Sequence, residues 1–498
     1  MRAVRFLAVL LALGSCSEPA APPAPSLTIG VLAAPAGIDP ARFDDPATSA
    51  IAKDVFETLV RVQPGSFTVV PGIASSWSTS ADGTAWTLHL RGKLLFSDGT
   101  ALDAAAVKLN LDRWHSAKDP NRGDGPYPAF AAKFGGFDDQ SAIVTIDAPS
   151  PDTVVIHTRE PFAPLLRDLA LPAFGIGSPK AIEWSIPAFD QAPVGSGAYM
   201  IDDVAQGDHV ALVRNPFWME GAPAFASSTV RFIPDPPTAR LALDKRDIDA
   251  ILDPTAAVLP DIISRHPRFV TGPRDTIAYL AFDVTRPPFN DVRLRRAVAD
   301  ALDANAVARV AGIGATPAYE LLPPGMIGAD SALTPARPNV EGAKGLLRGA
   351  NIPGSIVLYY AATPPPEMPG QTAVVNEIRA ELSQAGINAV PQPMGPAVVL
   401  PAPGVDGALG LIVTVAASGE PDDIFGPIAS EWNDLNFHNL LAAGRREFDD
   451  STRGRTYRRM EAMIRDDVVA VPLAYPVATS AVAPGLDLDA YPMFAGYR

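Results

Sequence analysis

Cysteine and histidine are scarce in this sequence of 498 residues. There is one cysteine, Cys16, and there are six histidines. A single cysteine excludes a disulfide framework and any zinc site built from cysteines. The histidines stand at positions 89, 115, 157, 209, 266 and 438, so no two lie three to five residues apart as a local metal-binding pair would. We therefore expect no cofactor and assign no metal ligand.

Long hydrophobic runs and positive charge are also in short supply. The one marked apolar run, Phe6 to Leu13, is far shorter than the roughly 20 residues that span a bilayer. Lysine and arginine number 40 against 55 acidic residues, which gives a net charge of −15. This balance argues against nucleic acid or an anionic membrane surface as a partner.

Motifs of common catalytic sites are missing as well. The sequence contains no G-x-S-x-G, no G-x-x-x-x-G-K-[ST], no H-E-x-x-H and no C-x-x-C. The adjacent acidic residues Asp422 and Asp423 are typical of a solvated surface rather than of a glycosidase pair. We therefore expect a protein that is not an enzyme, with a hydrolase as the rival class and a chaperone or sensor lipoprotein as a third.

The N-terminus has the pattern of an export signal. A short basic start precedes the apolar run, which ends in Leu13-Gly14-Ser15-Cys16. This ending resembles a bacterial lipobox, in which cleavage precedes the cysteine and its thiol is lipidated. An ordinary signal peptide with an incidental cysteine is the alternative. We expect residues 1–16 to be a lipoprotein signal peptide, Cys16 to be the lipidation site, and the proline- and alanine-rich residues 17–26 to be an extended tether.

The remaining chain predicts a large α/β protein. Its length suggests two or three domains, and its 47% hydrophobic content is ample for several cores. The 52 prolines, roughly twice the average share, indicate many loops and short helices.

One stretch, residues 193–240, is especially regular. Gly195-Ser196-Gly197 begins it, and two glycines so spaced permit positive φ and a close backbone approach. Strands are expected at 198–201, 210–214 and 229–233, with a turn at 206–208 between the first two. Prolines end the second and third strands, and a helix is expected to begin at Thr238.

The order of these segments resembles the extracellular solute-binding proteins of family 5, the peptide- and nickel-type binding proteins of ABC importers. The matching segments are Gly195-Ser196-Gly197-Ala198-Tyr199, Arg214-Asn215-Pro216-Phe217-Trp218, and Ile233-Pro234-Asp235 with Arg240. Further matches, such as Ile38-Asp39-Pro40 and Pro323-Pro324-Gly325, extend the resemblance over essentially the whole mature chain.

The resemblance implies an α/β fold of the two-lobed periplasmic-binding-protein kind (Venus-flytrap, type II, cluster C-like) with an extra subdomain. The first lobe would be discontinuous and would comprise residues 27–58, 178–272 and 472–498. Residues 59–177 would form the extra subdomain, and residues 273–471 the second lobe.

The resemblance also implies a function. The chain would be a monomeric lipoprotein, anchored by lipid in the periplasm, that captures a small solute and delivers it to ABC permease subunits by hinge closure. Its ligand would be a peptide or a peptide-like, amino-acid-derived compound. A nickel, metallophore or haem ligand is the alternative within the same family.

Residues that choose the ligand are expected in two groups. The first group comprises Asp39, on a loop that the resemblance places beside the cleft, Tyr127, in an aromatic, glycine- and proline-rich loop, and Tyr279, in the expected strand 278–283. For Tyr127 the alternative is a loop folded on its own side chains.

The second group follows the apolar strand near residue 411. Peptide-binding members carry there an aspartate that pairs with the α-ammonium of the peptide, and by spacing it falls at Ala417. That substitution argues against a classical free-amine peptide, and the apolar residues Val415, Ala416, Ala417 and Phe174 suggest a less charged ligand. The other candidates in this group are Ser418, Glu420, Asp422 and Trp432.

A nickel-type site has weaker support. Leu171-Pro172 fits that branch, but the positions that hold arginines there are Ala173, Phe174 and Gly175. His438 is the best candidate for a bare metal ion, although its place in an amphipathic helix favours a surface position.

Overall fold

The computed structural model describes residues 25–254, 269–395, 398, 407–488 and 491–494. Cys16, the expected signal peptide and most of the expected tether lie outside the described residues. Ser26, expected in the tether, is the first residue of strand β1. Within the described part of the chain, no helix is both long enough and apolar enough to cross a membrane.

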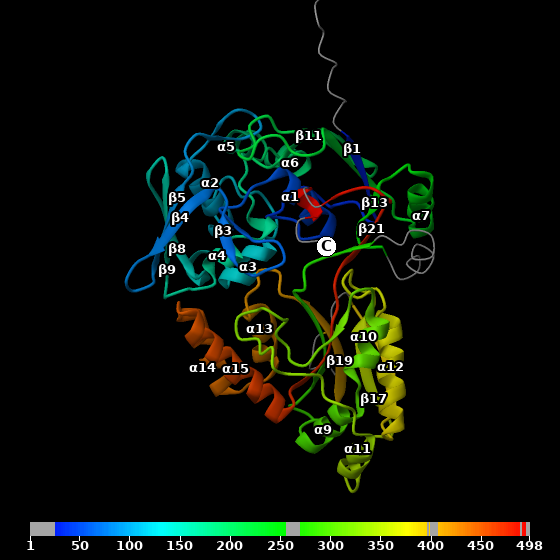
Figure 1. Cartoon of the computed structure of the whole chain (residues 1–498). Helices are drawn as coiled ribbons and strands as arrows, with labels where there is room; N and C mark the ends of the chain where they lie inside the picture. The colour runs from blue at the N-terminus through cyan, green and yellow to red at the C-terminus, as the bar shows by residue number, and fades with distance from the viewer. Residues whose placement is uncertain (1–24, 255–268, 396–397, 399–406, 489–490, 495–498) are drawn as a thin grey trace, which may run out of the picture.

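A seven-stranded sheet forms the first lobe, drawn at the top of Figure 1. Its central strand, β1, runs parallel to β12 and β13, and the antiparallel strands β10 and β11 extend one edge. Distant parts of the sequence share its core, from Leu27 in β1 to Phe494. The strands in spatial order are β10 (Tyr199–Ala205), β11 (His209–Arg214), β12 (Ser227–Phe232), β1 (Ser26–Val31), β13 (Ala250–Ile251), β21 (Thr479–Val482) and β14 (Phe269–Thr271). The accompanying helices are α1 (Pro46–Val55), α5 (Pro179–Trp184), α6 (Ile186–Gln191), α7 (Pro236–Lys245) and the 3-10 turn η3 (Pro492–Phe494).

A six-stranded sheet forms the second lobe. All seven residues of its strand β15 are buried, because helices cover both faces of the sheet. The strands in spatial order are β16 (Thr316–Pro317), β20 (Ala470–Tyr475), β15 (Thr276–Phe282), β19 (Ala408–Val415), β17 (Ile356–Ala361) and β18 (Ala389–Met394). One face packs on α9 (Val292–Ala301), α10 (Ala304–Ala311), α11 (Val340–Leu347) and α12 (Gln371–Gln384); the other packs on α13 (Asp422–Glu431), α14 (Leu435–Arg446) and α15 (Asp450–Asp467).

A third, separate core belongs to the subdomain at the upper left of Figure 1. Its four-stranded antiparallel sheet has the order β4 (Ala74–Thr79), β5 (Ala85–Leu90), β9 (Thr153–Thr158) and β8 (Ile143–Ser150). Two small ladders, β2 (Val60–Val62) with β3 (Val69–Pro71) and β6 (Leu94–Leu95) with β7 (Ala101–Leu102), complete the strands. The helices are α2 (Ala104–His115), α3 (Pro128–Phe134), α4 (Leu165–Asp168) and the 3-10 turns η1 (Asp138–Gln140) and η2 (Pro172–Phe174).

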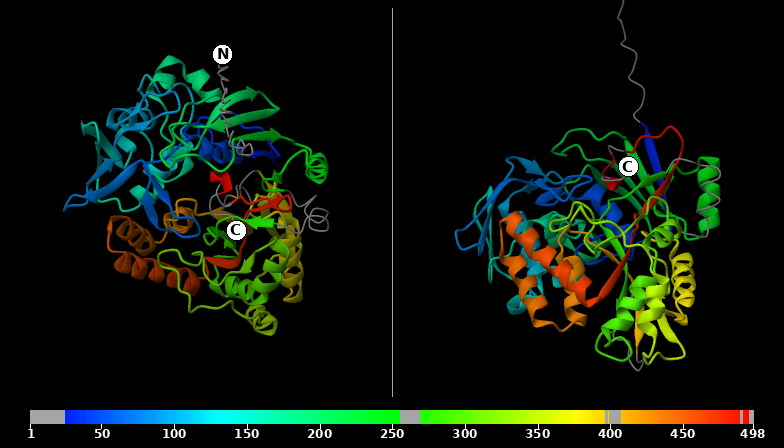
Figure 2. Two further views of the ribbon diagram at one scale, coloured as in Figure 1. Left: turned by 45° about the horizontal axis from the view of Figure 1, so that its top comes forward. Right: turned by 60° about the horizontal axis from the view of Figure 1, so that its bottom comes forward.

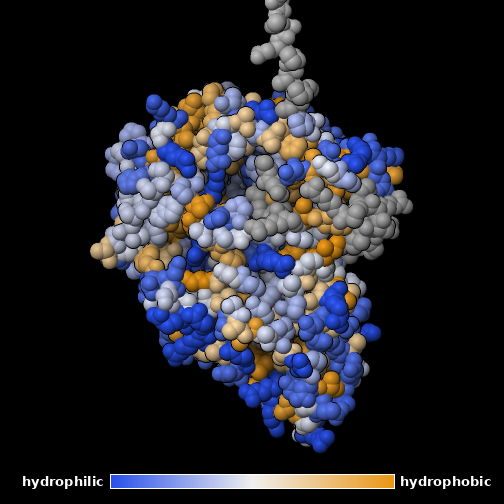
Figure 3. Space-filling model, in the orientation of Figure 1, coloured by the Kyte–Doolittle hydropathy of each residue, from blue (hydrophilic) through white to orange (hydrophobic). Residues whose placement is uncertain are grey.

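The views of Figure 2 keep the three parts distinct, and α14 and α15 lie beneath the subdomain in Figure 1. The expected α/β class is confirmed, whereas the residue boundaries between the parts stay predictions. Hydrophilic residues prevail over the second lobe on the face drawn in Figure 3.

The regular stretch at 193–240 folds as expected, with one correction. Its strands and its turn at Gly207 are confirmed as β10, β11 and β12. Gly195 and Gly197, however, do not adopt positive φ. They are needed for the close approach alone. A Cβ on Gly195 would lie 2.1 Å from the Val55 carbonyl oxygen, and a Cβ on Gly197 would lie 2.4 Å from the Asp54 carbonyl oxygen, both in α1.

The chain crosses between the two lobes at residues 272–275, between β14 and β15, and at residues 476–478, between β20 and β21. A hydrogen bond joins the two crossings, since the Gly272 amide donates to the Ala478 carbonyl at 2.7 Å. The crossings therefore lie side by side and define one narrow connection.

Candidate functional site

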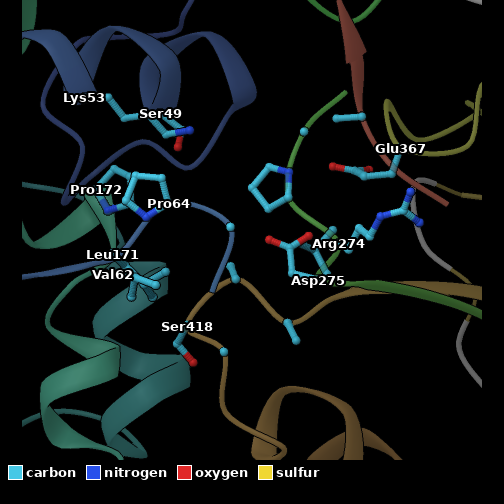
Figure 4. Close-up of a pocket in the computed structure, with 18 of the residues that line it drawn as sticks. Ser49, Lys53, Val62, Pro64, Leu171, Pro172, Arg274, Asp275, Glu367 and Ser418 are labelled. Carbon is cyan, nitrogen blue, oxygen red and sulfur yellow. The ribbon is translucent and has the colours of Figure 1, made fainter. Parts of the chain in front are cut away.

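A cavity of about 740 Å³ lies where the two lobes and the subdomain meet. All three parts supply its walls, which Figure 4 shows in close-up. The first lobe contributes α1, the subdomain contributes the loop 62–67 with Leu171 and Pro172, and the second lobe contributes residues 415–419. Both crossings reach it as well, through residues 271–275 and Ala478. The cavity is therefore placed where a movement of one lobe would change its shape.

The cavity carries more negative than positive side chains. Among the described residues that line it, four are carboxylates and two are cations, namely Asp44, Asp253, Asp275 and Glu367, and Lys53 and Arg274. In Figure 4 Lys53 extends from α1 on one side of the cavity, and Asp275 and Glu367 lie on the other side.

Burial perturbs three of these groups. It raises the pKa of Asp275 to about 6, and the nearby charge of Glu367 adds to the rise. Burial also raises the pKa of Glu367. It lowers the pKa of Lys53, although the charges of Asp253 and Asp275 oppose that change.

An apolar wall completes the cavity. Val415, Ala416 and Ala417 line it, as the sequence suggests, and Met493 adds a side chain from the C-terminal turn η3. Asp54 of α1 holds that turn, because its carboxylate accepts hydrogen bonds from the Tyr491 hydroxyl at 2.6 Å and the Met493 amide at 2.9 Å. Phe174 does not take part, since it is buried in the core of the subdomain. The cavity is therefore apolar in part, and its lining also carries the charged side chains described above.

Two of the eight candidate ligand residues, Ala417 and Ser418, line this cavity. The Ser418 hydroxyl receives a hydrogen bond from Lys133 of the subdomain at 3.0 Å and donates one to Asp423 at 2.9 Å. Lys133 also pairs with Asp423 and lies 3.5 Å from Asp168. Ser418 therefore joins the cavity wall to a group of charges that connects the subdomain with the second lobe.

Glu420 and Asp422 belong to the same connection and do not line the cavity, contrary to the prediction. The Glu420 side chain is 1% exposed and forms ion pairs with Arg167 of the subdomain at 2.7 Å and with Arg453 of α15 at 2.6 Å. Asp422 pairs with Arg445 at 2.5 Å. Because cations of the protein already pair with them, the structure gives both carboxylates a structural place.

Asp39 and Tyr127 form another buried cluster, away from the cavity lining. Asp39 pairs with Arg113 and accepts a hydrogen bond from the Ala41 amide at 3.1 Å. The Tyr127 hydroxyl donates to the Arg122 carbonyl at 2.6 Å and accepts from Arg113 at 3.2 Å. The alternative expectation for Tyr127, a loop folded on its own side chains, matches this placement.

The last two candidates lie in the core of the second lobe. Tyr279, in the middle of β15, is 1% exposed, and burial raises its pKa. Trp432 packs on Phe437 with ring centroids 5.2 Å apart. His438 lies on the half-buried side of α14, and no group of three or more potential metal-binding side chains occurs among the described residues.

Sequence reasoning missed Lys53, Asp275, Glu367 and Met493. Lys53 stands in the last turn of an amphipathic helix, where a lysine is ordinary. Asp275 directly precedes a strand, and Glu367 lies in the proline-rich segment PPPEMPG. No local pattern shows that these residues, from three separate segments, share one cavity.

Comparisons with known proteins agree with this architecture. A profile of the bacterial extracellular solute-binding proteins, family 5 (middle region), matches residues 68–435. Di/tripeptide-binding protein 2 of Pseudomonas aeruginosa is 25% identical over 95% of this chain and 94% of its own length. The glutathione-binding protein GsiB of Salmonella paratyphi A is 30% identical over 65% of this chain and 61% of its own length.

Solved structures show the same fold. HbpA2 from Haemophilus parasuis superposes with a TM-score of 0.79 at 21% identity, over 95% of this chain and 99% of the other. A nickel ABC transporter protein from Bacillus halodurans has a TM-score of 0.73 at 22% identity, over 94% and 98% of the two chains. The two-lobed architecture expected from the sequence is therefore confirmed. Because the matching profile covers well over half of the chain, the protein belongs to the bacterial extracellular solute-binding proteins of family 5.

Proposed function

We propose that this chain is the solute-binding component of an ABC importer. It captures a peptide or a peptide-like solute in the periplasm and delivers it to the permease when the lobes close around it. The cavity at the junction of the lobes is the observation that carries the proposal. Its volume of about 740 Å³ lies within the range of small-ligand sites, roughly 300–1,000 Å³. The relatives named for di- and tripeptides and for glutathione support a peptide-like ligand.

Ligand binding is tested most directly on the protein from its source. Native mass spectrometry of the purified chain should show a bound species of small mass. A thermal-shift panel of di- and tripeptides, nickel with chelators, haem and opine-like amino acids should then contain members that raise the melting temperature. At a ligand concentration 100 times the Kd, the expected stabilisation is about 2.7 kcal/mol.

The panel also separates the alternatives. A response confined to nickel chelates or haem would replace the peptide-like ligand with the alternative of the same family. Absence of any co-purified species together with a flat panel would contradict the proposal. Turnover of an ester or glycoside, lost on mutation of one acidic residue, would establish the rival hydrolase.

The lipid anchor forms a separate part of the proposal. Replacement of Cys16 by serine should abolish incorporation of labelled fatty acid and move the protein from the membrane fraction to the soluble periplasm. An unchanged distribution of the variant would contradict the anchor and leave the binding function standing.

A further inference from the structure

Asp275 occupies an unusual position in the cavity. It is the last residue of the first crossing, directly before β15. Its backbone carbonyl accepts a hydrogen bond from the Ala416 amide at 2.8 Å, and in the adjoining register Thr276 of β15 faces Val415 of β19. Asp275 therefore lies beside Ala416, which directly follows β19, and it lines the same cavity as Ala416 and Ala417.

Asp275 and Glu367 are not neutralised by the protein. Neither forms an ion pair with a cation among the residues that the structure describes. The one hydrogen bond that Asp275 receives from another side chain comes from the neutral Thr276 hydroxyl, at 3.1 Å. Glu367 adds a second negative charge on the same side of the cavity.

The cations near these two carboxylates leave them open to the cavity. Lys53 lies across the cavity on α1 and forms no ion pair with either carboxylate among the described residues. The Arg274 side chain is exposed and makes a 3.4 Å contact with the Thr316 hydroxyl. The wall at Asp275 thus has two half-buried carboxylates, a cavity in front of them and no cation within ion-pair distance among the described residues.

We propose that Asp275 and Glu367 bind a cationic nitrogen of the ligand, a primary ammonium such as the α-ammonium of an unblocked peptide. This inference rests on the proposed function and names the chemical class of its ligand. It also removes the argument from Ala417 against a free-amine peptide. Asp275, directly before β15, can hold the ammonium without a carboxylate at position 417.

An ammonium suits this wall for two reasons. It has three N–H donors, so it can donate to both carboxylates at once, and hydrogen bonds between charged partners are about twice as strong as neutral ones. Its positive charge also favours the ionised carboxylates that burial disfavours. Lys53, on the opposite wall, can pair with an anionic group at the other end of the same ligand.

The test compares a mixed dipeptide library with the same library after N-acetylation, which removes the ammonium and leaves the side chains. Calorimetry and thermal shift are measured on the full chain and on the variants Asp275→Asn and Glu367→Gln. The control is Glu381→Gln in α12. Glu381 is also a buried carboxylate with a pKa raised to about 7, but it accepts its hydrogen bond from the Asp303 amide and does not line the cavity.

The free library should bind the unmodified protein and the Glu381→Gln control equally, and the acetylated library at least tenfold more weakly. Asp275→Asn should lower affinity for the free library about tenfold or more, and Glu367→Gln should lower it by a smaller factor. Affinity of the unmodified protein should also fall as pH drops below about 6, because Asp275 then becomes protonated, and Asp275→Asn should remove most of this dependence. A merely structural role would not produce that pH profile.

Two results would overturn the inference while leaving the proposed function intact. One is equal binding of free and acetylated libraries, and the other is unchanged affinity in both cavity variants. If neither library binds any form of the protein, the peptide-like ligand of the proposed function fails, and this inference fails with it.

Discussion

Two sets of buried or half-buried carboxylates occur in this protein and differ in their partners. In the connection between the subdomain and the second lobe, Glu420 has two arginine partners, and Asp423 has Lys133. In the cavity, Asp275 and Glu367 have no ion-pair partner among the described residues. Burial of a charge is costly unless it is paired. A carboxylate that the chain itself pairs therefore holds the fold together, and a carboxylate left open to a cavity is available to a ligand.

Loss of a paired carboxylate should have the largest effect. Glu420→Gln would leave Arg167 and Arg453 without their counter-charge, and breaking a buried pair in this way costs about 3–5 kcal/mol. The free energy of unfolding, measured with denaturant, should fall by about 3 kcal/mol, whereas Glu381→Gln, which removes a charge that burial disfavours and keeps an acceptor for the Asp303 amide, should not lower it. Unchanged stability combined with lost ligand affinity would instead return Glu420 to the ligand site.

Loss of an unpaired carboxylate should act in the opposite direction. In the free protein, Asp275→Asn removes a charge whose ionisation burial disfavours, as the pKa of about 6 indicates. Because the side chain is partly exposed, we expect a gain of only about 1–2 kcal/mol at pH 7.5. A loss of stability would show that Asp275 has a favourable partner in the free protein and would end the contrast with Glu420.

The pH dependence of that gain gives a finer measurement. A raised pKa means that the folded protein binds a proton that the unfolded chain, with a pKa near 4, has released. The cost of ionised Asp275 is therefore complete above about pH 6 and disappears as pH falls toward 4. The difference in unfolding free energy between Asp275→Asn and the unmodified protein should be about half as large at pH 5 as at pH 7.5. This decrease amounts to no more than about 1 kcal/mol. A difference that stays constant over this range would mean that Asp275 does not titrate there.

An exposed ion pair across the same connection should have the smallest effect. Arg446 of α14 donates to Glu160 of the subdomain at 2.9 Å, but the two side chains are 50% and 48% exposed. Exposed pairs contribute about 0–1 kcal/mol, so Glu160→Gln should lower thermal stability by no more than about 0.5 kcal/mol. A loss approaching that of Glu420→Gln would show that burial is not what separates the two kinds of pair.

Local patterns predicted much of the fold. The sequence predicts strands at 356–360 and 387–392 with a helix at 371–385 between them, and the structure has β17, α12 and β18 there, because this unit is encoded within about 40 residues. The sequence also predicts a helix over 437–443, and the observed helix is longer, from Leu435 to Arg446, since Asp434 caps it by accepting a hydrogen bond from the Phe437 amide at 2.8 Å. That capping aspartate was readable in the sequence.

The site was less predictable, because its decisive contacts join distant residues. Nothing near Glu420 in the sequence shows that Arg167, 253 positions earlier, neutralises it. Likewise, nothing near Asp275 in the sequence shows that it lies beside Ala416 and Glu367, which belong to other segments. Residue type alone therefore favoured carboxylates that the protein itself pairs, and only their partners separate the two sets.

The bonded pair of crossings gives the cavity a fixed end and a variable end. Asp275 belongs to one of these crossings, about which the lobes would turn, whereas Ser418 and the loop 62–67 belong to the second lobe and the subdomain. A charged group held near the crossings is displaced little by rotation, and the other walls move by an amount that depends on what lies between them. One part of the wall would then select the charge of the ligand, and another part would select its length. A change in the loop 62–67 could therefore alter the preferred ligand size without altering the preferred charge.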